Sequence, residues 1–121
     1  EIPSSVDGES LLPLTEAPES IQRTWLYGEH SYDIFSNHWI VTGTDKYIWY
    51  SQTGQEQYFD LSSDPHELTD LIKDPSRQER IRKLRSCLIR TLKDRPEGFT
   101  DGERLIPGRS YPPSLPNAVL P

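Results

Sequence analysis

Residues 38–61 read HWIVTGTDKYIWYSQTGQEQYFDL, and this stretch decides the fold of the protein. It holds three short runs of β-branched and aromatic residues, separated by two polar segments that contain Gly43 and Gly54. Runs of this kind, bounded by glycine and polar residues, are typical of antiparallel strands joined by short turns. The stretch therefore predicts three consecutive antiparallel strands.

The middle run is unusual because its apolar residues do not alternate with polar ones. Residues 47–50 (YIWY) are all large and apolar or aromatic, so successive side chains place rings on both faces of the strand. A sheet that is buried on one face alone would leave roughly half of these side chains in water. We therefore expect protein to cover both faces of this sheet.

A fourth strand is predicted upstream, over residues 21–29 (IQRTWLYGE). In this segment Trp25 and Tyr27 share one face, as the two-residue period of a strand requires. Gly28 is expected to mark a bulge or the end of the strand, because glycine weakens a strand interior.

A first helix-start signal follows the three strands, at residues 64–67 (DPHE). Asp64 is expected to be the N-cap, and Glu67 is placed to reach back to the N–H of the cap. The signal predicts a short helix that carries Leu68 and Leu71.

A second start signal, Asp74-Pro75, predicts a longer helix that extends to about Lys93. Its apolar residues recur with the helical period of 3.6 residues and form one stripe, made of Ile81, Leu84, Leu88 and Leu92. The predicted fold is α+β: a small four-stranded antiparallel sheet with one long C-terminal helix packed on one face, and extended N- and C-terminal segments.

The two ends of the chain are rich in proline. Residues 1–20 are also acidic, and LLPL at 11–14 indicates one apolar helical turn that is broken by Pro13. Residues 96–121 hold six Pro and three Gly, which predicts an extended tail that wraps another surface or is disordered alone. We therefore divide the chain into a linker segment (1–20), an α+β subdomain (21–95) and an extended tail (96–121).

Length and charge limit the partners that the protein can have. The chain has 121 residues, of which 33% are hydrophobic, so it forms one domain at most, with a small core. Its net charge of −6 argues against a nucleic acid partner, and no apolar run is long enough to predict a membrane span. The lone Cys87 lies near the edge of the helical stripe, which predicts a semi-buried, inert thiol.

Charge is segregated along the chain. Residues 76–95 hold eight basic residues against two acidic ones. This pattern predicts a solvated basic helix face, with a phosphate- or membrane-binding helix as the alternative.

The sequence contains no complete catalytic or metal-binding set. The three His are far apart, and none has a second ligand at the spacing that metal sites use. Glu29 and His30 follow a strand and a glycine, where the chain leaves the sheet, and they are the candidate substrate-binding residues, with a surface turn as the alternative. The aromatic run around Trp49 is expected to be an interface, with a sugar-stacking platform as the alternative.

Taken in order, these motifs resemble the C-terminal subdomain of bacterial arylsulfatase-type sulfatases, which belong to the alkaline-phosphatase-like superfamily. The matching pieces are KYI at 46–48, FDL at 59–61 and DPHE at 64–67. They follow WLYGEH at 25–30 and precede an amphipathic helix and DRPEGF at 94–99. The similarity covers about residues 6–109, most of the chain.

The resemblance implies a helix across one face of the sheet and a large α/β catalytic domain, absent from this chain, against the other. It also implies that the whole enzyme hydrolyses sulfate esters with a formylglycine, made from the Cys or Ser of a C/S-x-P-x-R motif, beside a Ca²⁺ ion. Cys87 lies in CLIR, without the proline, so neither a catalytic residue nor a metal ligand is predicted here. Many bacterial relatives are exported to the periplasm.

The expected function is therefore that of an inactive C-terminal fragment, which completes the fold and shapes the substrate cleft, with Glu29 and His30 at its rim. The isolated chain is expected to self-associate through its exposed sheet face, because large apolar patches rarely stay in water. Two alternatives are the C-terminal part of a phosphonate or phosphate monoester hydrolase, and a stand-alone module that binds carbohydrate or protein.

Overall fold

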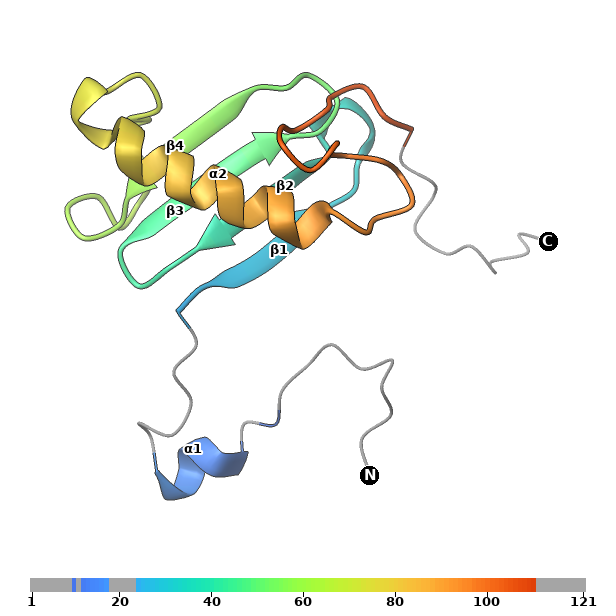
Figure 1. Cartoon of the computed structure of the whole chain (residues 1–121). Coiled ribbons are helices and arrows are strands. Elements are labelled where there is room, and N and C mark those ends of the chain that lie inside the picture. Colours follow the sequence, from blue (N-terminus) through green and yellow to red (C-terminus); the bar gives the residue numbers. More distant parts are fainter. Residues whose placement is uncertain (1–9, 11, 18–23, 111–121) are drawn as a thin grey trace.

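The protein forms one antiparallel sheet with a long helix lying across it (Figure 1). The computed structural model describes residue 10 and residues 12–17 and 24–110. The elements in chain order are α1 (Leu12–Glu16), β1 (Leu26–His30), η1 (Asp33–Phe35), β2 (Asn37–Val41), β3 (Asp45–Tyr50), β4 (Glu56–Asp60), η2 (Pro75–Arg77) and α2 (Gln78–Leu92). The strands lie in the order β1-β2-β3-β4, each antiparallel to the next. The predicted α+β fold is confirmed.

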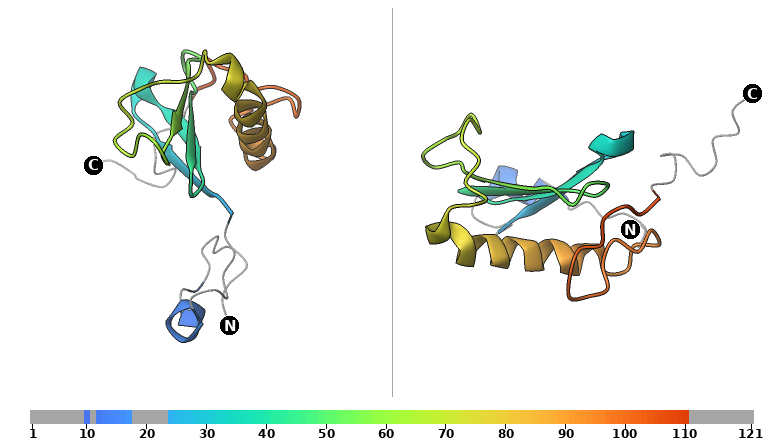
Figure 2. Two further views of the ribbon diagram at one scale, coloured as in Figure 1. Left: turned by 90° about the vertical axis from the view of Figure 1, so that its left-hand side faces the viewer. Right: turned by 90° about the horizontal axis from the view of Figure 1, so that it is seen from above.

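The strand register divides the sheet into two faces. Ile40, Tyr47 and Tyr58 stand opposite one another on neighbouring strands and are fully buried under α2. Trp39 and Ile48 also pair across the sheet, but their side chains alternate to the other face, where they are half-buried. We call this second surface, opposite α2, the open face (Figure 2).

The core lies between the sheet and α2. All four residues of the predicted stripe are buried: Ile81, Leu84, Leu88 and Leu92. Burying four such side chains contributes about 6–10 kcal/mol before the entropy cost of ordering the chain. Cys87 is buried beside them, and burial raises the pKa of its thiol, in agreement with an inert role.

β1 begins later than the sequence predicts. Residues 21–23 lie outside the described residues, and the strand starts at Leu26 and extends to His30. Gly28 is neither a bulge nor a strand end, because it pairs with Trp39 in the middle of the strand. A Cβ atom added to Gly28 would lie 2.3 Å from atoms of the Trp39 indole. The glycine is therefore required because the indole crosses the strand at this point.

We expect Gly28→Ala to destabilise the protein by about 1–3 kcal/mol, because the new methyl group displaces the Trp39 indole. Equilibrium unfolding in urea measures this loss. In a Trp39→Leu background the same substitution should cost less than in the wild type, since the smaller side chain leaves the Cβ free. An equal cost in both backgrounds would show that the indole is not the reason for the glycine.

The first helix-start signal is wrong, because residues 61–73 form turns and no helix. Glu67 adopts a left-handed backbone conformation (φ 55°), which interrupts helical geometry. The Asp64 carboxylate accepts a hydrogen bond from the backbone N–H of Thr69 at 2.8 Å, so it organises a turn. Glu67 does not reach back to the cap but accepts hydrogen bonds from Nζ of Lys46 at 2.8 and 2.9 Å.

The Lys46–Glu67 pair ties this loop to the open face, since Lys46 alternates with the buried Tyr47 along β3. Phe59, directly opposite Lys46 on β4, is buried. Leu71 packs against the core, whereas Leu68 is exposed. In Figure 2 the loop lies on the side of the sheet away from α2. It covers the β4 end of the open face and leaves the middle half-exposed.

The segment after α2 packs against the protein's own sheet. Phe99 is fully buried, and the backbone N–H of Ile106 donates to its carbonyl oxygen at 2.8 Å. Gly108 donates to the carbonyl of Ser51 at 2.9 Å, on the turn after β3. Residues 96–110 thus pack against this protein's own sheet and turns. Residues 111–121 lie outside the described residues. The division into linker, subdomain and tail stays a prediction.

The N-terminal helical turn also differs from the prediction. α1 includes Pro13 in its first turn, where the missing N–H is not needed, so the proline does not break it. Leu11 and residues 1–9 lie outside the described residues. No residue of α1 is buried. In the described part of the chain, none of the helices has the length and apolar character of a membrane span.

Candidate functional site

Glu29 lies near the end of β1, on the face that α2 covers. Its carboxylate accepts hydrogen bonds from the hydroxyl of Tyr27 at 2.5 Å and from Nη1 of Arg95 at 3.0 Å. Nδ1 of His38 lies 3.5 Å from the same carboxylate. Glu29 therefore connects the edge strand to the segment that follows α2, and it is engaged by groups of the protein itself.

His38 occupies the buried side of this cluster. Its ring is fully buried, 4.7 Å from the Phe99 ring and 5.7 Å from the Trp49 ring, between ring centroids. Burial lowers the pKa of His38 to about 4, although the nearby Glu29 carboxylate acts in the opposite direction. The imidazole is therefore neutral near pH 7 and accepts or donates a hydrogen bond at Nδ1 with the Tyr27 hydroxyl, at 2.8 Å.

His30 lies on the other face from Glu29, because successive side chains of a strand alternate. Its exposed ring lies 6.2 Å from that of Tyr32, and Tyr32 stacks on Phe35 at 6.4 Å, both between ring centroids. The structure therefore does not bring the two predicted site residues together. Contact of either residue with a substrate stays a prediction.

An ordered turn displays these rings, and we call residues 30–36 the aromatic turn. The hydroxyl of Ser36 accepts from the N–H of Tyr32 at 2.9 Å and donates to the carbonyl of Asp33 at 2.8 Å. Asp33 has a positive φ of 46°, which costs free energy outside glycine. The large side chains at its tip are exposed to 65% (Tyr32), 54% (Ile34) and 57% (Phe35). The turn is thus held by hydrogen bonds while its apolar side chains are exposed to solvent.

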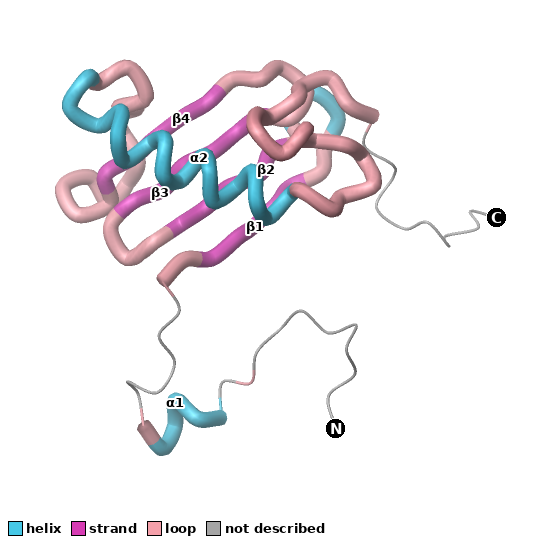
Figure 3. Tube along the Cα trace, viewed as in Figure 1, coloured by secondary structure: helices cyan, strands magenta, loops and turns pink. Residues whose placement is uncertain are grey.

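The aromatic turn and the open face lie on the same side of the molecule, away from α2 (Figure 2), and Figure 3 shows the short helix of this turn at one end of the sheet. In the middle of this side, Trp39, Val41, Ile48 and Tyr50 are only half-buried. The long helix α2 covers the opposite face. A contiguous apolar surface of this kind on a small protein usually marks a site of interaction with another protein or a ligand.

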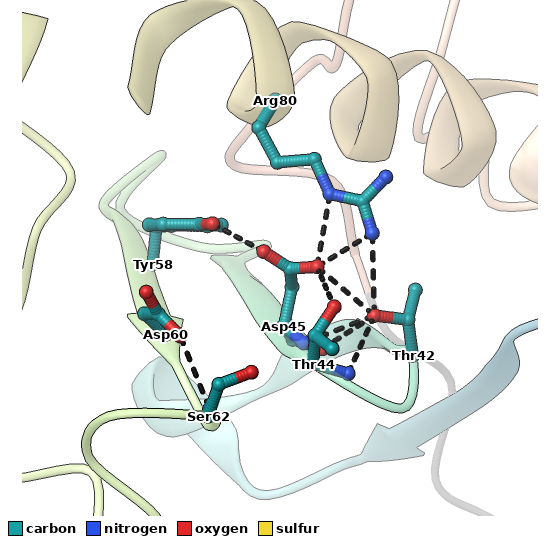
Figure 4. Close-up of polar contacts among 7 residues, drawn as sticks. All are labelled: Thr42, Thr44, Asp45, Tyr58, Asp60, Ser62 and Arg80. Carbon is teal, nitrogen blue, oxygen red and sulfur yellow. Dashed lines mark hydrogen bonds and ion pairs between the residues drawn. The ribbon is translucent and has the colours of Figure 1, made fainter. Parts of the chain in front are cut away.

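Polar groups also join α2 to the sheet, at the β2–β3 turn (Figure 4). The buried Asp45 carboxylate accepts from Nε of Arg80 at 2.9 Å, from the Thr44 hydroxyl at 2.6 Å and from the Tyr58 hydroxyl. Burial opposes ionisation of Asp45, but these hydrogen bonds outweigh it and lower its pKa to about 2. Since every Asp45 oxygen is engaged, this cluster stabilises the fold and offers no free group for catalysis.

A metal site is not found among the described residues. No group of three or more His, Cys, Asp or Glu side chains within residues 24–110 or the short N-terminal part is placed to hold an ion. No described residue is therefore assigned to a Ca²⁺ ion.

Comparison with known proteins identifies the relatives of this fold. The chain is 52% identical over 113 residues to an arylsulfatase of Clostridium perfringens (strain 13 / Type A), a match that covers 93% of this chain and 23% of the relative. No protein-family profile matches the chain.

Two solved structures contain the same fold. One, determined in complex with its substrate D-glucosamine-2-N,6-O-disulfate, has a TM-score of 0.69 and 22% identity and covers 77% of this chain and 21% of its own. The other, a 2-O GAG sulfatase, has a TM-score of 0.69 and 23% identity and covers 82% of this chain and 22% of its own. The chain spans less than a quarter of the length of each of these relatives. It is homologous to a part of a bacterial arylsulfatase, which confirms the resemblance stated from its motifs.

Proposed function

We propose that this chain is the C-terminal part of a sulfuric ester hydrolase of the arylsulfatase type, inactive alone, which completes the enzyme and shapes its substrate cleft. The observation that carries the proposal is the 52% identity to an arylsulfatase over 93% of the chain. Identity at this level over more than a hundred residues supports a shared role as well as a shared fold.

The open face supports the proposal physically. It carries half-buried rings at its centre, and the aromatic turn adds exposed apolar side chains beside it. The match covers less than a quarter of each relative's length, so the relatives contain further protein that such a face can pack against. The catalytic domain of the sulfatase is the proposed partner, and without it the chain is expected to self-associate through the same face.

The proposal places the chemistry outside this chain. The formylglycine nucleophile and the Ca²⁺ ion would belong to the catalytic domain, and no described residue here is assigned to either. The aromatic turn, which includes His30, is proposed to form part of the cleft rim, because its side chains are exposed where β1 ends. Glu29 is proposed to contribute to the same rim through its position in β1, since its carboxylate is already bound by Tyr27 and Arg95.

A chimera tests this role. When this chain replaces the homologous segment of the C. perfringens arylsulfatase, we expect hydrolysis of 4-nitrophenyl sulfate, whereas deletion of the segment should abolish it. Tyr32→Ala with Phe35→Ala in the chimera should weaken domain docking by about 2 kcal/mol or more, because aromatic residues dominate interface energies. Lys83→Ala, at an exposed position of α2 on the opposite side of the molecule, is the control and should have no effect. Hydrolysis by the isolated chain would contradict the proposal.

The reaction class has its own test. The coding sequence upstream of Glu1 should contain a C/S-x-P-x-R motif if the whole protein is a sulfatase. Activity of that whole protein on phosphonate or phosphate monoesters, with none on sulfate esters, would favour the alternative hydrolase. A stable monomer of the isolated chain that binds glycans saturably would instead favour the binding module.

A further inference from the structure

The cations of η2, α2 and the segment that follows fall into two groups. Those that face the sheet each meet a carboxylate of the sheet or the following loop; these pairs are Arg77 with Asp60, Arg80 with Asp45, Arg85 with Glu56, and Arg95 with Glu29 and Glu97. The second group lies on the outer side of α2. There Lys83 pairs with Glu79 at 2.8 Å. Within the described part of the chain, no carboxylate lies at ion-pair distance from Arg82 or Arg90, or from the exposed Lys93 that directly follows α2.

The second group forms a continuous feature. Arg82, Ser86 and Arg90 are spaced by four residues, so they follow one another along the outer side of the helix, over about 12 Å. With Glu79 and Lys83 they line a shallow hollow in the protein surface. All are exposed. We call Arg82, Ser86 and Arg90 the basic strip; it holds unneutralised positive charge on a protein whose net charge is −6.

We propose that the basic strip binds a linear sulfated polysaccharide. Guanidinium groups suit this ligand because their planar donor pairs match the oxygens of a sulfate group, and the small Ser86 between them leaves room and adds a hydroxyl. An extended ligand with repeated charges matches two cations spaced along one helix. That such a polymer is also the substrate rests on the function proposed above, but the binding itself does not.

The position of the strip favours this use. It lies on the side of α2 away from the sheet, and the open face lies beyond the sheet, so the two surfaces are on opposite sides of the molecule (Figure 2). A catalytic domain seated on the open face would leave the strip accessible. The strip would then hold a sulfated chain near the enzyme and raise its local concentration, as fields of charged surface groups do for oppositely charged ligands.

Two other anionic partners fit less well. A helix that binds a membrane surface presents apolar residues beside its cations, whereas the apolar stripe of α2 is buried against the sheet. Single-stranded nucleic acid is bound through aromatic side chains on which bases stack, and α2 has none. A sulfated polysaccharide needs neither feature.

The test measures binding of this chain to heparin, with unsulfated dextran as the uncharged comparison. We expect heparin affinity that falls as salt rises, and an affinity about tenfold lower in the variant Arg82→Gln with Arg90→Gln, since each exposed contact is modest. Glutamine keeps helix propensity, and circular dichroism confirms the fold of each variant. Lys73→Gln with Arg109→Gln removes the same charge from exposed cations outside α2 and should stay within about twofold of the wild type.

Equal losses in the two double variants would overturn the proposal, because binding would then follow net charge and not the strip. Absence of heparin binding would also overturn it. So would binding to phosphatidylserine vesicles or single-stranded DNA that is as strong as heparin binding and is abolished by the Arg82 and Arg90 substitutions. The heparin measurement does not depend on sulfatase activity. A negative result therefore rejects the binding proposal without affecting the chimera experiment, and an inactive chimera does not affect the heparin result.

Discussion

Phe99→Ala is expected to destabilise the protein by about 3–5 kcal/mol, although the residue lies in a segment without helix or strand. The Phe99 ring is fully buried, at 4.7 Å from the His38 ring and 6.0 Å from the Trp49 ring, between centroids. Its removal leaves a cavity between the sheet and the segment that follows α2. Equilibrium unfolding in guanidinium chloride, followed by tryptophan fluorescence, measures the loss.

Two matched variants separate this effect from a general loss of an aromatic ring. Phe99→Leu keeps most of the buried volume and should cost about 1.5 kcal/mol or less. Phe35→Ala removes the same ring from an exposed position and should change stability by about 0.5 kcal/mol or less. If Phe99→Ala unfolded at the denaturant concentration of the wild type, residues 96–110 would not belong to the folded unit.

Asp45→Asn is expected to cost about 2 kcal/mol at pH 7, with a pH dependence that identifies the cause. The folded-state pKa of Asp45 is lowered from 3.8 to about 2 by hydrogen bonds from Arg80, Thr44 and Tyr58, which outweigh its burial. A pKa lowered in the folded state means that the ionised carboxylate stabilises the fold. This stability is fully present above about pH 4 and is lost as the pH falls from 3.8 towards 2.

The free energy of unfolding of wild type and variant should therefore differ at pH 7 and converge near pH 2. A double-mutant cycle with Arg80→Gln isolates the ion pair, whose coupling is reduced by solvent because the Arg80 side chain is 40% exposed. A difference between wild type and Asp45→Asn that stays constant from pH 7 to pH 2 would show that packing, and not charge, is responsible.

Protonation of His38 changes the stability over a different pH range and does not interfere with this comparison. Burial lowers its folded-state pKa from 6.5 to about 4, so the unfolded chain binds a proton first. The stability associated with the neutral imidazole is therefore present above pH 6.5 and is lost between pH 6.5 and 4. Wild type and Asp45→Asn share this loss, and it cancels in their comparison.

Local signals predicted the elements that local forces build. The three strands of residues 38–61 were predicted from runs of β-branched and aromatic residues between glycine-containing turns, and the stripe on α2 from its period of 3.6 residues. Both signals lie in residues that are close in sequence. The DPHE signal at 64–67 failed because contacts with distant residues, and not the local sequence, decide the conformation there. Its cap residue was read correctly as a hydrogen-bond acceptor, but Lys46, far away in the sequence, engages Glu67 and the chain turns there.

The candidate site was less predictable than the fold. Glu29 and His30 are neighbours in sequence, but the strand places their side chains on opposite faces. The alternation of side chains along β1 was the signal that could have separated them. The cluster of Tyr27, His38 and Arg95 around Glu29 was missed altogether. Its members come from three separate segments, and no local spacing connects them.

The sequence by itself determined the α+β class, the burial of α2 on one face and the surplus of aromatic rings for the other, because each follows from the order of apolar and polar residues along a single element. Only the tertiary structure decided that Gly28 makes room for the Trp39 indole and that Phe99 completes the core. It also decided that four cations of the helical segment pair with carboxylates of the sheet, whereas Arg82 and Arg90 do not. These features depend on contacts between residues far apart in the chain, and such contacts exist only once the strands have taken their register.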